Sequence, residues 1–340
     1  MYWANGTGCT QAWGAAMPSV PYTVNAEGRG PAWSNSLFEN NAEFALGMLL
    51  SMKQQRNKVR MWVCELMELE SGLAAQIQLW LDTFDDVDAS MNASKALFAA
   101  LEETELTGRS RVLKEQIISA KDQLARKTVW MYGGDGWAYD IGFGGLDHVI
   151  AQGEDINIFV VDTEVYSNTG GQSSKATPLG AVAQFQSAGK KSAKKDLGRM
   201  MMSQGNCYVA SVAMGADPNQ LMKAIDEAEH FCGPSIVIAY APCINHGLKI
   251  GMDKAQEEMK RAVDAGYWFL YRYNPHKETG KFYLDSKEPS LNYQEFLEGE
   301  NRYASLHKAF PENAERLFAQ AEKDAKARYK ELVRLAGEDK

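Results

Sequence analysis

The sequence predicts an α/β fold in which helices flank a mostly parallel sheet. Apolar runs at residues 128–132 and 156–161 indicate two buried strands, and residues 142–152 between them can form a helix. Further apolar runs alternate with amphipathic segments along the rest of the chain, and they give candidate strands at residues 207–213, 235–240 and 267–273. This alternation is typical of parallel sheets whose strands are joined by helical crossovers.

The remaining elements divide the chain into three expected parts. Residues 1–126 combine a loop rich in Gly, Pro and Asn, over residues 1–30, with a helical subregion packed on the sheet. Residues 127–273 form the α/β core. Residues 274–340 start as an irregular segment and end in a charged helical arm, which suits contact with a partner subunit. The expected helices cover residues 35–70, segments of 71–126, residues 217–231 (Asp217 as N-cap, Pro218 at the first position), 252–265 and 313–335.

Composition narrows the classes of function. The chain has 340 residues, of which 45% are hydrophobic and 24% charged, so a packed globular core is expected. A net charge of −8 argues against nucleic acid or an anionic membrane as the main partner. No apolar run is long enough to span a bilayer. The first residues lack the basic and apolar regions of a signal peptide, so we expect a cytoplasmic protein.

Two polar loops follow the first two predicted strands of the core. Asp135 lies in a glycine turn, Gly133-Gly134-Asp135-Gly136-Trp137, and Thr163 opens the second loop. Both loops lie at the carboxyl ends of neighbouring parallel strands, where α/β sheets bind ligands. Glycines and helix-start amides let the backbone approach phosphate oxygens. The Asp135 carboxylate, the Thr163 hydroxyl and a backbone carbonyl can hold Mg²⁺ on a diphosphate. The alternatives are an ordinary turn aspartate and a threonine bonded to its own backbone.

Other polar residues carry weaker signals. Lys190, Lys191, Lys194 and Lys195 form a basic stripe at helical spacing, which indicates a solvated helix face. None of the five histidines shows metal-ligand spacing. The five cysteines contain no C-x-x-C pair and do not suggest a disulfide framework, so their spacing alone indicates buried thiols.

The spacing of the two loops resembles the thiamine diphosphate motif, although Thr163 stands where most families with that motif have Asn. Further runs make the chain resemble the carboxy-terminal, thiamine-diphosphate-binding region of the pyruvate:ferredoxin (flavodoxin) oxidoreductases. These runs are residues 162–175 (DTEVYSNTGGQSSK), 6–9 (GTGC, with Trp13 after it), 27–39 (EGRGPAWSNSLFE), 195–199 (KDLGR) and 240–247 (YAPCINHG). They cover most of residues 5–250 in one order.

The resemblance implies a set of site residues. Asp135, Thr163 and the Val165 carbonyl would hold Mg²⁺. Asn168 would lie in the active site, close to the aminopyrimidine and the substrate. Cys9 and Cys243 match ligands of the 4Fe-4S cluster nearest thiamine, and Cys9 also borders the cofactor. The other residues implied to line thiamine diphosphate are Gly134, Gly136, Trp137, Glu164, Tyr166 and Ser167.

The resemblance also implies a reaction. Pyruvate would be oxidatively decarboxylated to carbon dioxide and acetyl-coenzyme A, with electrons passing through iron–sulfur clusters to ferredoxin or flavodoxin in a cytoplasmic, anaerobic metabolism. The full enzyme is expected to be a homodimer. The family's other two cluster ligands form a C-x-x-C pair upstream of Cys9, and the glutamate that activates the aminopyrimidine comes from a separate domain.

We therefore expect this chain to be a truncated piece, or to need other subunits, and to be inactive alone. Two alternatives stay open at this point. One is a non-catalytic module that binds thiamine diphosphate for assembly. The other is action on a different 2-oxoacid, such as 2-oxoglutarate.

Overall fold

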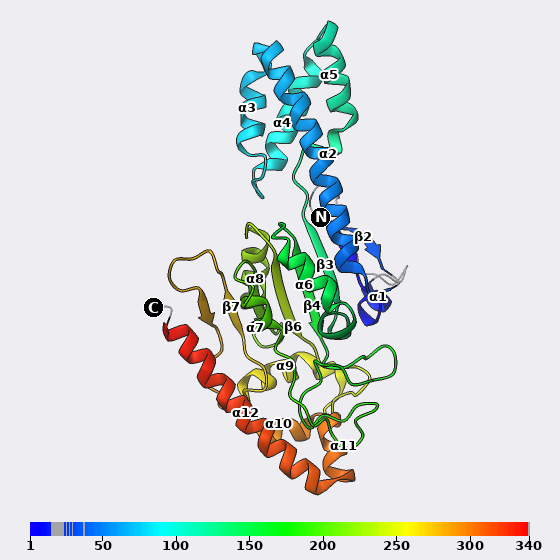
Figure 1. Cartoon of the computed structure of the whole chain (residues 1–340), viewed down its shortest axis with the longest axis vertical. Coiled ribbons are helices and arrows are strands. Elements are labelled where there is room, and N and C mark those ends of the chain that lie inside the picture. Colours follow the sequence, from blue (N-terminus) through cyan, green and yellow to red (C-terminus); the bar gives the residue numbers. More distant parts are fainter. Residues whose placement is uncertain (15–23, 25, 27, 29, 37, 339–340) are drawn as a thin grey trace. The chain divides into compact units, whose positions relative to one another are not determined.

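The computed structural model describes residues 1–14, 24, 26, 28, 30–36 and 38–338, and parts of the quoted run 27–39 therefore lie outside the described residues. Its strands are β1 (Tyr2–Asn5), β2 (Ala32–Asn35), β3 (Val129–Gly134), β4 (Asn157–Asp162), β5 (Tyr208–Val212), β6 (Ser235–Tyr240), β7 (Tyr271–Tyr273) and β8 (Phe282–Leu284). They form one sheet in the order β2-β1-β3-β4-β6-β5-β7-β8 (Figure 1). Strands β7 and β8 are antiparallel to their neighbours and the other pairs are parallel. The predicted α/β fold with a mostly parallel sheet is confirmed.

Helices make up most of the remaining structure. The α-helices are α1 (Cys9–Gly14), α2 (Asn41–Leu69), α3 (Ala74–Asp82), α4 (Ser90–Glu103), α5 (Gly108–Ser119), α6 (Phe143–Ala151), α7 (Leu197–Met202), α8 (Pro218–Glu229), α9 (Ala255–Asp264), α10 (Tyr293–Gly299), α11 (Asn301–Ala309) and α12 (Pro311–Glu338). Short turns of other helix types are η1 (Ser71–Leu73), η2 (Lys121–Gln123), η3 (Gly136–Ile141) and η4 (Met252–Lys254). Within the described residues, no helix is long and apolar enough to cross a membrane.

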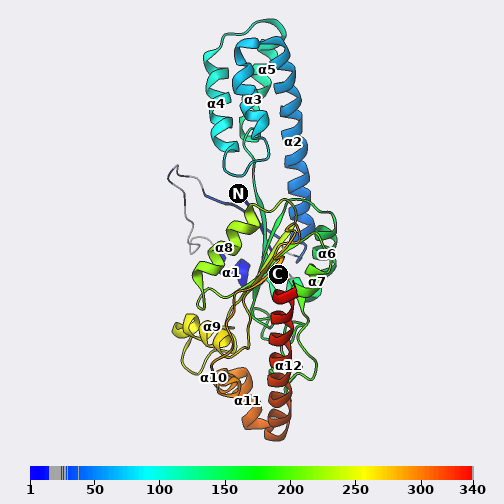
Figure 2. The same cartoon turned by 90° about the vertical axis from the view of Figure 1, so that its left-hand side faces the viewer.

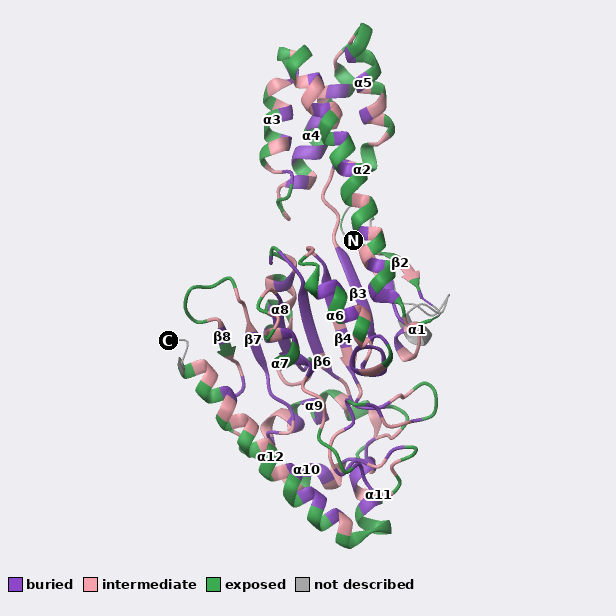
Figure 3. Cartoon of the chain, in the orientation of Figure 1, coloured by how far each residue is buried: buried purple, intermediate pink, exposed green. Residues whose placement is uncertain are grey.

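The chain divides into two compact units. One unit comprises Met1–Ala45 with Val129–Lys340 and contains the whole sheet, and the other comprises Leu46–Thr128. The second unit is helical, as predicted, and buried positions lie along its helices α2 to α5 (Figure 3). Its core includes the buried apolar side chains of Val63, Ile77 and Leu97. The predicted packing of this helical segment on the sheet stays a prediction.

In the sheet unit, helices cover both faces. Helix α8 lies on one face, and α6 and α7 lie on the other (Figure 2). Helix α8 begins as predicted, because the Asp217 carboxylate accepts a hydrogen bond from the Gln220 amide at 2.9 Å and Pro218 takes the first position. Its Ala224 and Ala228 pack with Trp130, Tyr208 and Val237 of the strands in one buried cluster. Small helix residues thus let α8 approach the sheet closely.

Several sequence predictions need correction. Residues 1–30 are not all loop, since Tyr2–Asn5 form β1, which pairs with β2 and β3. The predicted strand 267–273 shortens to β7, because the backbone N–H groups of Tyr267 and Trp268 bond to the Ala262 carbonyl at the end of α9 and leave the sheet ladder. The polar segment after residue 274 is not irregular throughout, since it contains β8 and α10.

The carboxy-terminal helix is longer than predicted and is partly buried. Helix α12 places Leu317, Phe318 and Ala321 in the interior, and it contacts α10, α11 and β8 of its own unit. One face of the helix is therefore used within the chain. A contact of the other face with a partner subunit stays a prediction.

Candidate functional site

The glycine turn that carries Asp135 follows β3 directly. Asp135 precedes η3, a π-helical turn of the kind that recurs at functional sites. A Cβ atom on Gly136 would lie 2.2 Å from the Tyr166 ring, and one on Gly133 would lie 2.5 Å from the Trp137 ring. Only glycine leaves room for these two aromatic side chains against the backbone. The sequence of the turn therefore fixes both the path of the chain and the wall around Asp135.

The second loop follows the neighbouring strand, as predicted. Strands β3 and β4 are parallel with Gly134 opposite Val161, so Asp135 and Thr163 emerge side by side. The Thr163 hydroxyl oxygen lies 2.9 Å from Asp135 Oδ1 and 3.1 Å from the Val165 carbonyl oxygen. In an octahedral Mg²⁺ site with ligands at about 2.1 Å, adjacent ligand oxygens lie about 3.0 Å apart. The Thr163 hydroxyl oxygen thus lies at the distance of a neighbouring Mg²⁺ ligand from each of the other two oxygens assigned from the sequence.

Burial strongly affects the Asp135 carboxyl group, which is 1% exposed. Burial, with a further contribution from the nearby Asp162 carboxylate, raises the pKa of Asp135 to about 7. Hydrogen bonds from Ser174 Oγ at 2.9 Å and from Thr163 act in the opposite direction. A cation in contact with this carboxylate would favour its ionised form, because an opposite charge stabilises a buried anion.

A network of buried charges lies behind the second loop. Lys194 Nζ lies 2.7 Å from Asp162 Oδ2 and 2.9 Å from Glu164 Oε1. Arg302 pairs with Glu164 and Glu300 at 3.2 Å each. With Asp135, four buried carboxylates therefore face three cations in this region, namely Lys190, Lys194 and Arg302. The excess of one carboxylate favours a site for a further cation.

This network corrects the predicted lysine stripe. Residues 190–196 are not helical, and the Lys190 ammonium group donates to the carbonyl oxygens of Ser174 at 2.8 Å and Thr177 at 2.5 Å. Burial alone would lower the pKa of Lys194, but Asp162 and Glu164 outweigh it and raise that pKa. The periodicity of these lysines was misleading, because two of them hold the loops of the site together from the inside.

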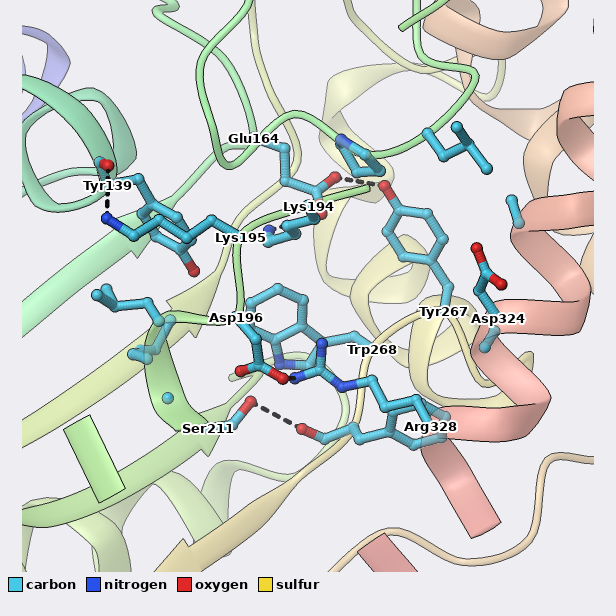
Figure 4. Close-up of a pocket in the computed structure, with 18 of the residues that line it drawn as sticks. Tyr139, Glu164, Lys194, Lys195, Asp196, Ser211, Tyr267, Trp268, Asp324 and Arg328 are labelled. Carbon is cyan, nitrogen blue, oxygen red and sulfur yellow. Dashed lines mark hydrogen bonds and ion pairs between the residues drawn. The ribbon is translucent and has the colours of Figure 1, made fainter. Parts of the chain in front are cut away.

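Glu164 faces away from the predicted cofactor cavity. Its side chain lines a neighbouring cavity of about 160 Å³ with Lys194, Trp268 and Arg328, and its carboxylate accepts a hydrogen bond from the Tyr267 hydroxyl (Figure 4). The backbone of Glu164 has a φ of 66° in the left-handed region, which turns the loop between Thr163 and Val165. The predicted cofactor contact of Glu164 stays a prediction, and the structure gives this side chain a role in holding the loop.

A cavity of about 80 Å³ collects the other predicted residues. Its walls include Asp135, Trp137, Asn168 and Cys9, and the remaining predicted members are Gly134, Gly136, Thr163, Val165, Tyr166 and Ser167. Sequence reasoning missed Thr7, Gly8, Thr10 and Glu39, which line the same cavity, and Ser174, which bonds to Asp135. These residues lie in or next to the sequence runs that resemble the family, and their spacing alone does not mark them as site residues.

The two cysteines assigned to an iron–sulfur cluster lie near one hydroxyl group. Cys243 Sγ lies 3.3 Å from Ser167 Oγ, and Cys9 also hydrogen-bonds to Ser167. Burial raises the pKa of the Cys9 thiol, and the nearby Cys243 and Asp135 add to this effect. Among the described residues, no group of three or more His, Cys, Asp or Glu side chains is arranged to hold a metal ion. Two thiols thus converge at the site, half the number that one 4Fe-4S cluster needs.

Comparison with known proteins places this site in a family. Residues 116–239 match the family described as thiamine pyrophosphate enzyme, C-terminal TPP binding domain, where thiamine pyrophosphate is another name for thiamine diphosphate. The matched segment contains both loops of the site.

Full-chain relatives have much longer sequences. Pyruvate-flavodoxin oxidoreductase of Klebsiella pneumoniae is 54% identical over 341 residues, which cover 99% of this chain and 29% of that protein. Pyruvate:ferredoxin oxidoreductase of Moorella thermoacetica is 53% identical, and the matched region covers 98% of this chain and 29% of that protein. Mitochondrial pyruvate dehydrogenase (NADP(+)) of Euglena gracilis is 45% identical, and the matched region covers 98% of this chain and 18% of that protein. The chain, which spans less than a third of the length of these relatives, therefore contains a thiamine diphosphate-binding domain and is homologous to one segment of the pyruvate:ferredoxin (flavodoxin) oxidoreductases.

Proposed function

We propose that this chain binds magnesium thiamine diphosphate as part of a pyruvate:ferredoxin (flavodoxin) oxidoreductase. The observation that carries the proposal is the position of the Thr163 hydroxyl oxygen, which lies at adjacent-ligand distance from both Asp135 Oδ1 and the Val165 carbonyl oxygen. The excess of buried carboxylates around them supports a cation, and the family match supports a diphosphate cofactor. The relatives' names support pyruvate as the 2-oxoacid.

The residues of this chain would divide the work at the cofactor. Asp135, Thr163 and the Val165 carbonyl would hold Mg²⁺ and, through it, the diphosphate, while the glycine turn would let the backbone amides approach phosphate oxygens. When bound, thiamine diphosphate accepts the electrons released as a 2-oxoacid loses carbon dioxide. Asn168, on the cavity wall, would orient the substrate, and Trp137 would exclude water from one side.

Cys9 and Cys243 would supply two ligands to a 4Fe-4S cluster next to the cofactor. A cluster of this kind needs four thiolates, and the relatives' length leaves room for the other ligands in segments that this chain does not match. Coenzyme A would take the acetyl group, and ferredoxin or flavodoxin would take the electrons. The full enzyme would act as a cytoplasmic homodimer, without nucleic acid or membrane partners.

Titration calorimetry tests the cofactor part of the proposal. The 340-residue chain should bind thiamine diphosphate with Mg²⁺ and lose that binding when a chelator removes the metal. Heat of binding that is the same with and without Mg²⁺ would contradict the proposed site.

A second measurement tests whether this segment has activity without the rest of the proposed enzyme. The chain alone should not reduce a viologen dye with pyruvate, coenzyme A, Mg²⁺ and thiamine diphosphate, because it offers two thiols and no assigned glutamate for cofactor activation. General acid–base help of that kind contributes about 10²–10⁴-fold in rate. Adding the rest of a relative's polypeptide should restore turnover, whereas rapid dye reduction by the chain alone would overturn this assignment.

A further inference from the structure

Glu39 occupies a strained position beside the cofactor cavity. Its φ is 57°, in the left-handed region that residues with side chains rarely adopt. Among the described residues, Glu39, Glu164 and Phe185 are the non-glycine residues with positive φ. Strain of this kind persists where the surrounding structure holds it, and it clusters at functional sites. Glu164 already lies in the loop that carries the proposed metal ligands, so Glu39 requires its own explanation.

The carboxyl group of Glu39 is incompletely satisfied. It lines the cavity that also contains Asp135 and Thr163, and it forms a hydrogen bond with the Thr7 hydroxyl. Its second oxygen, Oε2, is buried and has no hydrogen-bond partner. Burial of the group raises the pKa of Glu39 above its ordinary value. A buried carboxylate oxygen without a donor is costly, so this oxygen is suited to a donor from a ligand.

The chain does not need this carboxylate to start helix α2. Ser36 Oγ accepts hydrogen bonds from the backbone amides of Asn40 at 3.1 Å and Phe38 at 3.3 Å. Ser36 therefore provides the side-chain cap for the turn that leads into the helix. The Glu39 side chain instead reaches across to the loop after β1 through Thr7, and its charge acts on Tyr166 of the second loop.

We propose that Glu39 is a ligand-contacting residue whose free carboxylate oxygen accepts a hydrogen bond from a donor that enters with magnesium thiamine diphosphate. This inference rests on the proposed function. The ionised diphosphate has acceptors and no donors, so the donor is either the amino group of the cofactor or a water molecule on the metal. Both are hydrogen-bond donors beside a cation, which is the environment that an ionised carboxylate prefers.

Titration calorimetry with two ligands tests the proposal and identifies the donor. The variants are Glu39→Gln and the matched control Glu43→Gln, which changes an exposed glutamate one turn along α2. We expect Glu39→Gln to lower the affinity for magnesium thiamine diphosphate by about tenfold or more, and we expect Glu43→Gln to bind it with wild-type affinity. If Glu39→Gln loses the same factor of affinity for magnesium pyrophosphate, which has no amino group, the donor to Glu39 is metal-bound water. If its affinity for magnesium pyrophosphate is unchanged, the donor is the amino group of the cofactor. Wild-type affinity of Glu39→Gln for thiamine diphosphate overturns the inference, whereas absence of binding by the wild-type chain overturns the proposed function instead.

A glycine substitution separates ligand contact from a structural role. Glycine adopts a φ of 57° without strain, so Glu39→Gly should keep or raise the thermal midpoint of the chain while losing affinity for the cofactor. Gain of stability with loss of binding would show that the strain is retained for the ligand. A fall in the midpoint, with affinity unchanged, would show that Glu39 serves the fold and would overturn the inference.

Discussion

The helical unit of residues 46–128 and the loops at the carboxyl ends of β3 and β4 use their interiors in opposite ways. The helical unit buries mainly apolar side chains, such as Val63, Ile77, Leu97 and Leu113. Its one buried arginine, Arg56, donates to the Phe84 carbonyl and stacks over the Phe84 ring at 3.8 Å. The loops and the adjoining end of β4 bury Asp135, Asp162 and Glu164, and Glu300, between α10 and α11, adds a fourth carboxylate to a region with three cations. The comparison indicates that the first region is built for stability and the second for a charged ligand.

The largest expected effect is on cofactor binding. Asp135→Ala removes the charged member of the proposed ligand set, so affinity for magnesium thiamine diphosphate should fall at least a thousandfold, or about 4 kcal/mol. Titration calorimetry measures this change, and Asp147→Ala, an exposed aspartate on α6, is the control. Because the helical unit contains no part of the site, hydrogen exchange of its amides should stay unchanged. Equal affinity in wild type and Asp135→Ala would remove Asp135 from the site.

The next effect tests whether the buried network stabilises the loops. Lys194→Met leaves Asp162 and Glu164 without their shared cation, which should cost the sheet unit about 3–4 kcal/mol. Hydrogen exchange of the β4 amides reports this local loss, with the exposed Lys191→Met as control. Protection that changes by less than about 1 kcal/mol would mean that the network is not structurally important.

A core mutation in the helical unit should lower the stability of that unit and leave cofactor affinity unchanged. Leu97 is fully buried in α4, so Leu97→Ala should destabilise the helical unit by about 2–3 kcal/mol through lost burial and a cavity. Exchange of the α3 and α4 amides should speed up, while affinity for magnesium thiamine diphosphate should stay at the wild-type value. A matching loss of cofactor affinity would show that the two regions are not separate in function.

The central strands β3 and β4 were predicted from the sequence, and the proposed ligands Asp135 and Thr163 were placed at their ends, because both inferences depend on local signals. The apolar runs of β3 and β4 and the glycines around Asp135 are readable in order along the chain. Lys194 and Glu39 were not predictable in this way, since their roles come from contacts with Glu164 and Thr7 that only the folded chain creates. Strands β1 and β2 are four residues each, too short for a clear alternation signal. The helical character of residues 71–126 was predicted correctly because a mainly apolar stripe at helical spacing is a simple pattern to recognise, whereas the packing of this segment on the sheet stays a prediction.

The smallest expected effect concerns pH. Burial, with a further contribution from Arg302, lowers the pKa of His246 to about 4, so the folded sheet unit holds this ring neutral. In the unfolded chain the pKa of this histidine has its ordinary value of about 6.5. The contribution of the neutral His246 ring to the free energy of unfolding is therefore complete above about pH 6.5 and is lost as the pH falls toward 4. Between pH 7.5 and 5.5 the loss should be about 1 kcal/mol, and His246→Gln should abolish this part of the pH dependence.

Hydrogen exchange at the two pH values, corrected for intrinsic rates, measures the His246 effect. The helical unit provides an internal reference, because all five histidines of the chain lie outside residues 46–128. Protonation of Asp135, whose pKa burial raises to about 7, stabilises the sheet unit over the same pH range, so the His246 effect is measured by comparing the two proteins. Relative to the helical unit, the wild-type sheet unit should lose about 1 kcal/mol more protection on acidification than the sheet unit of His246→Gln. Equal losses in wild type and His246→Gln would show that the pKa of His246 does not differ between the folded and the unfolded chain.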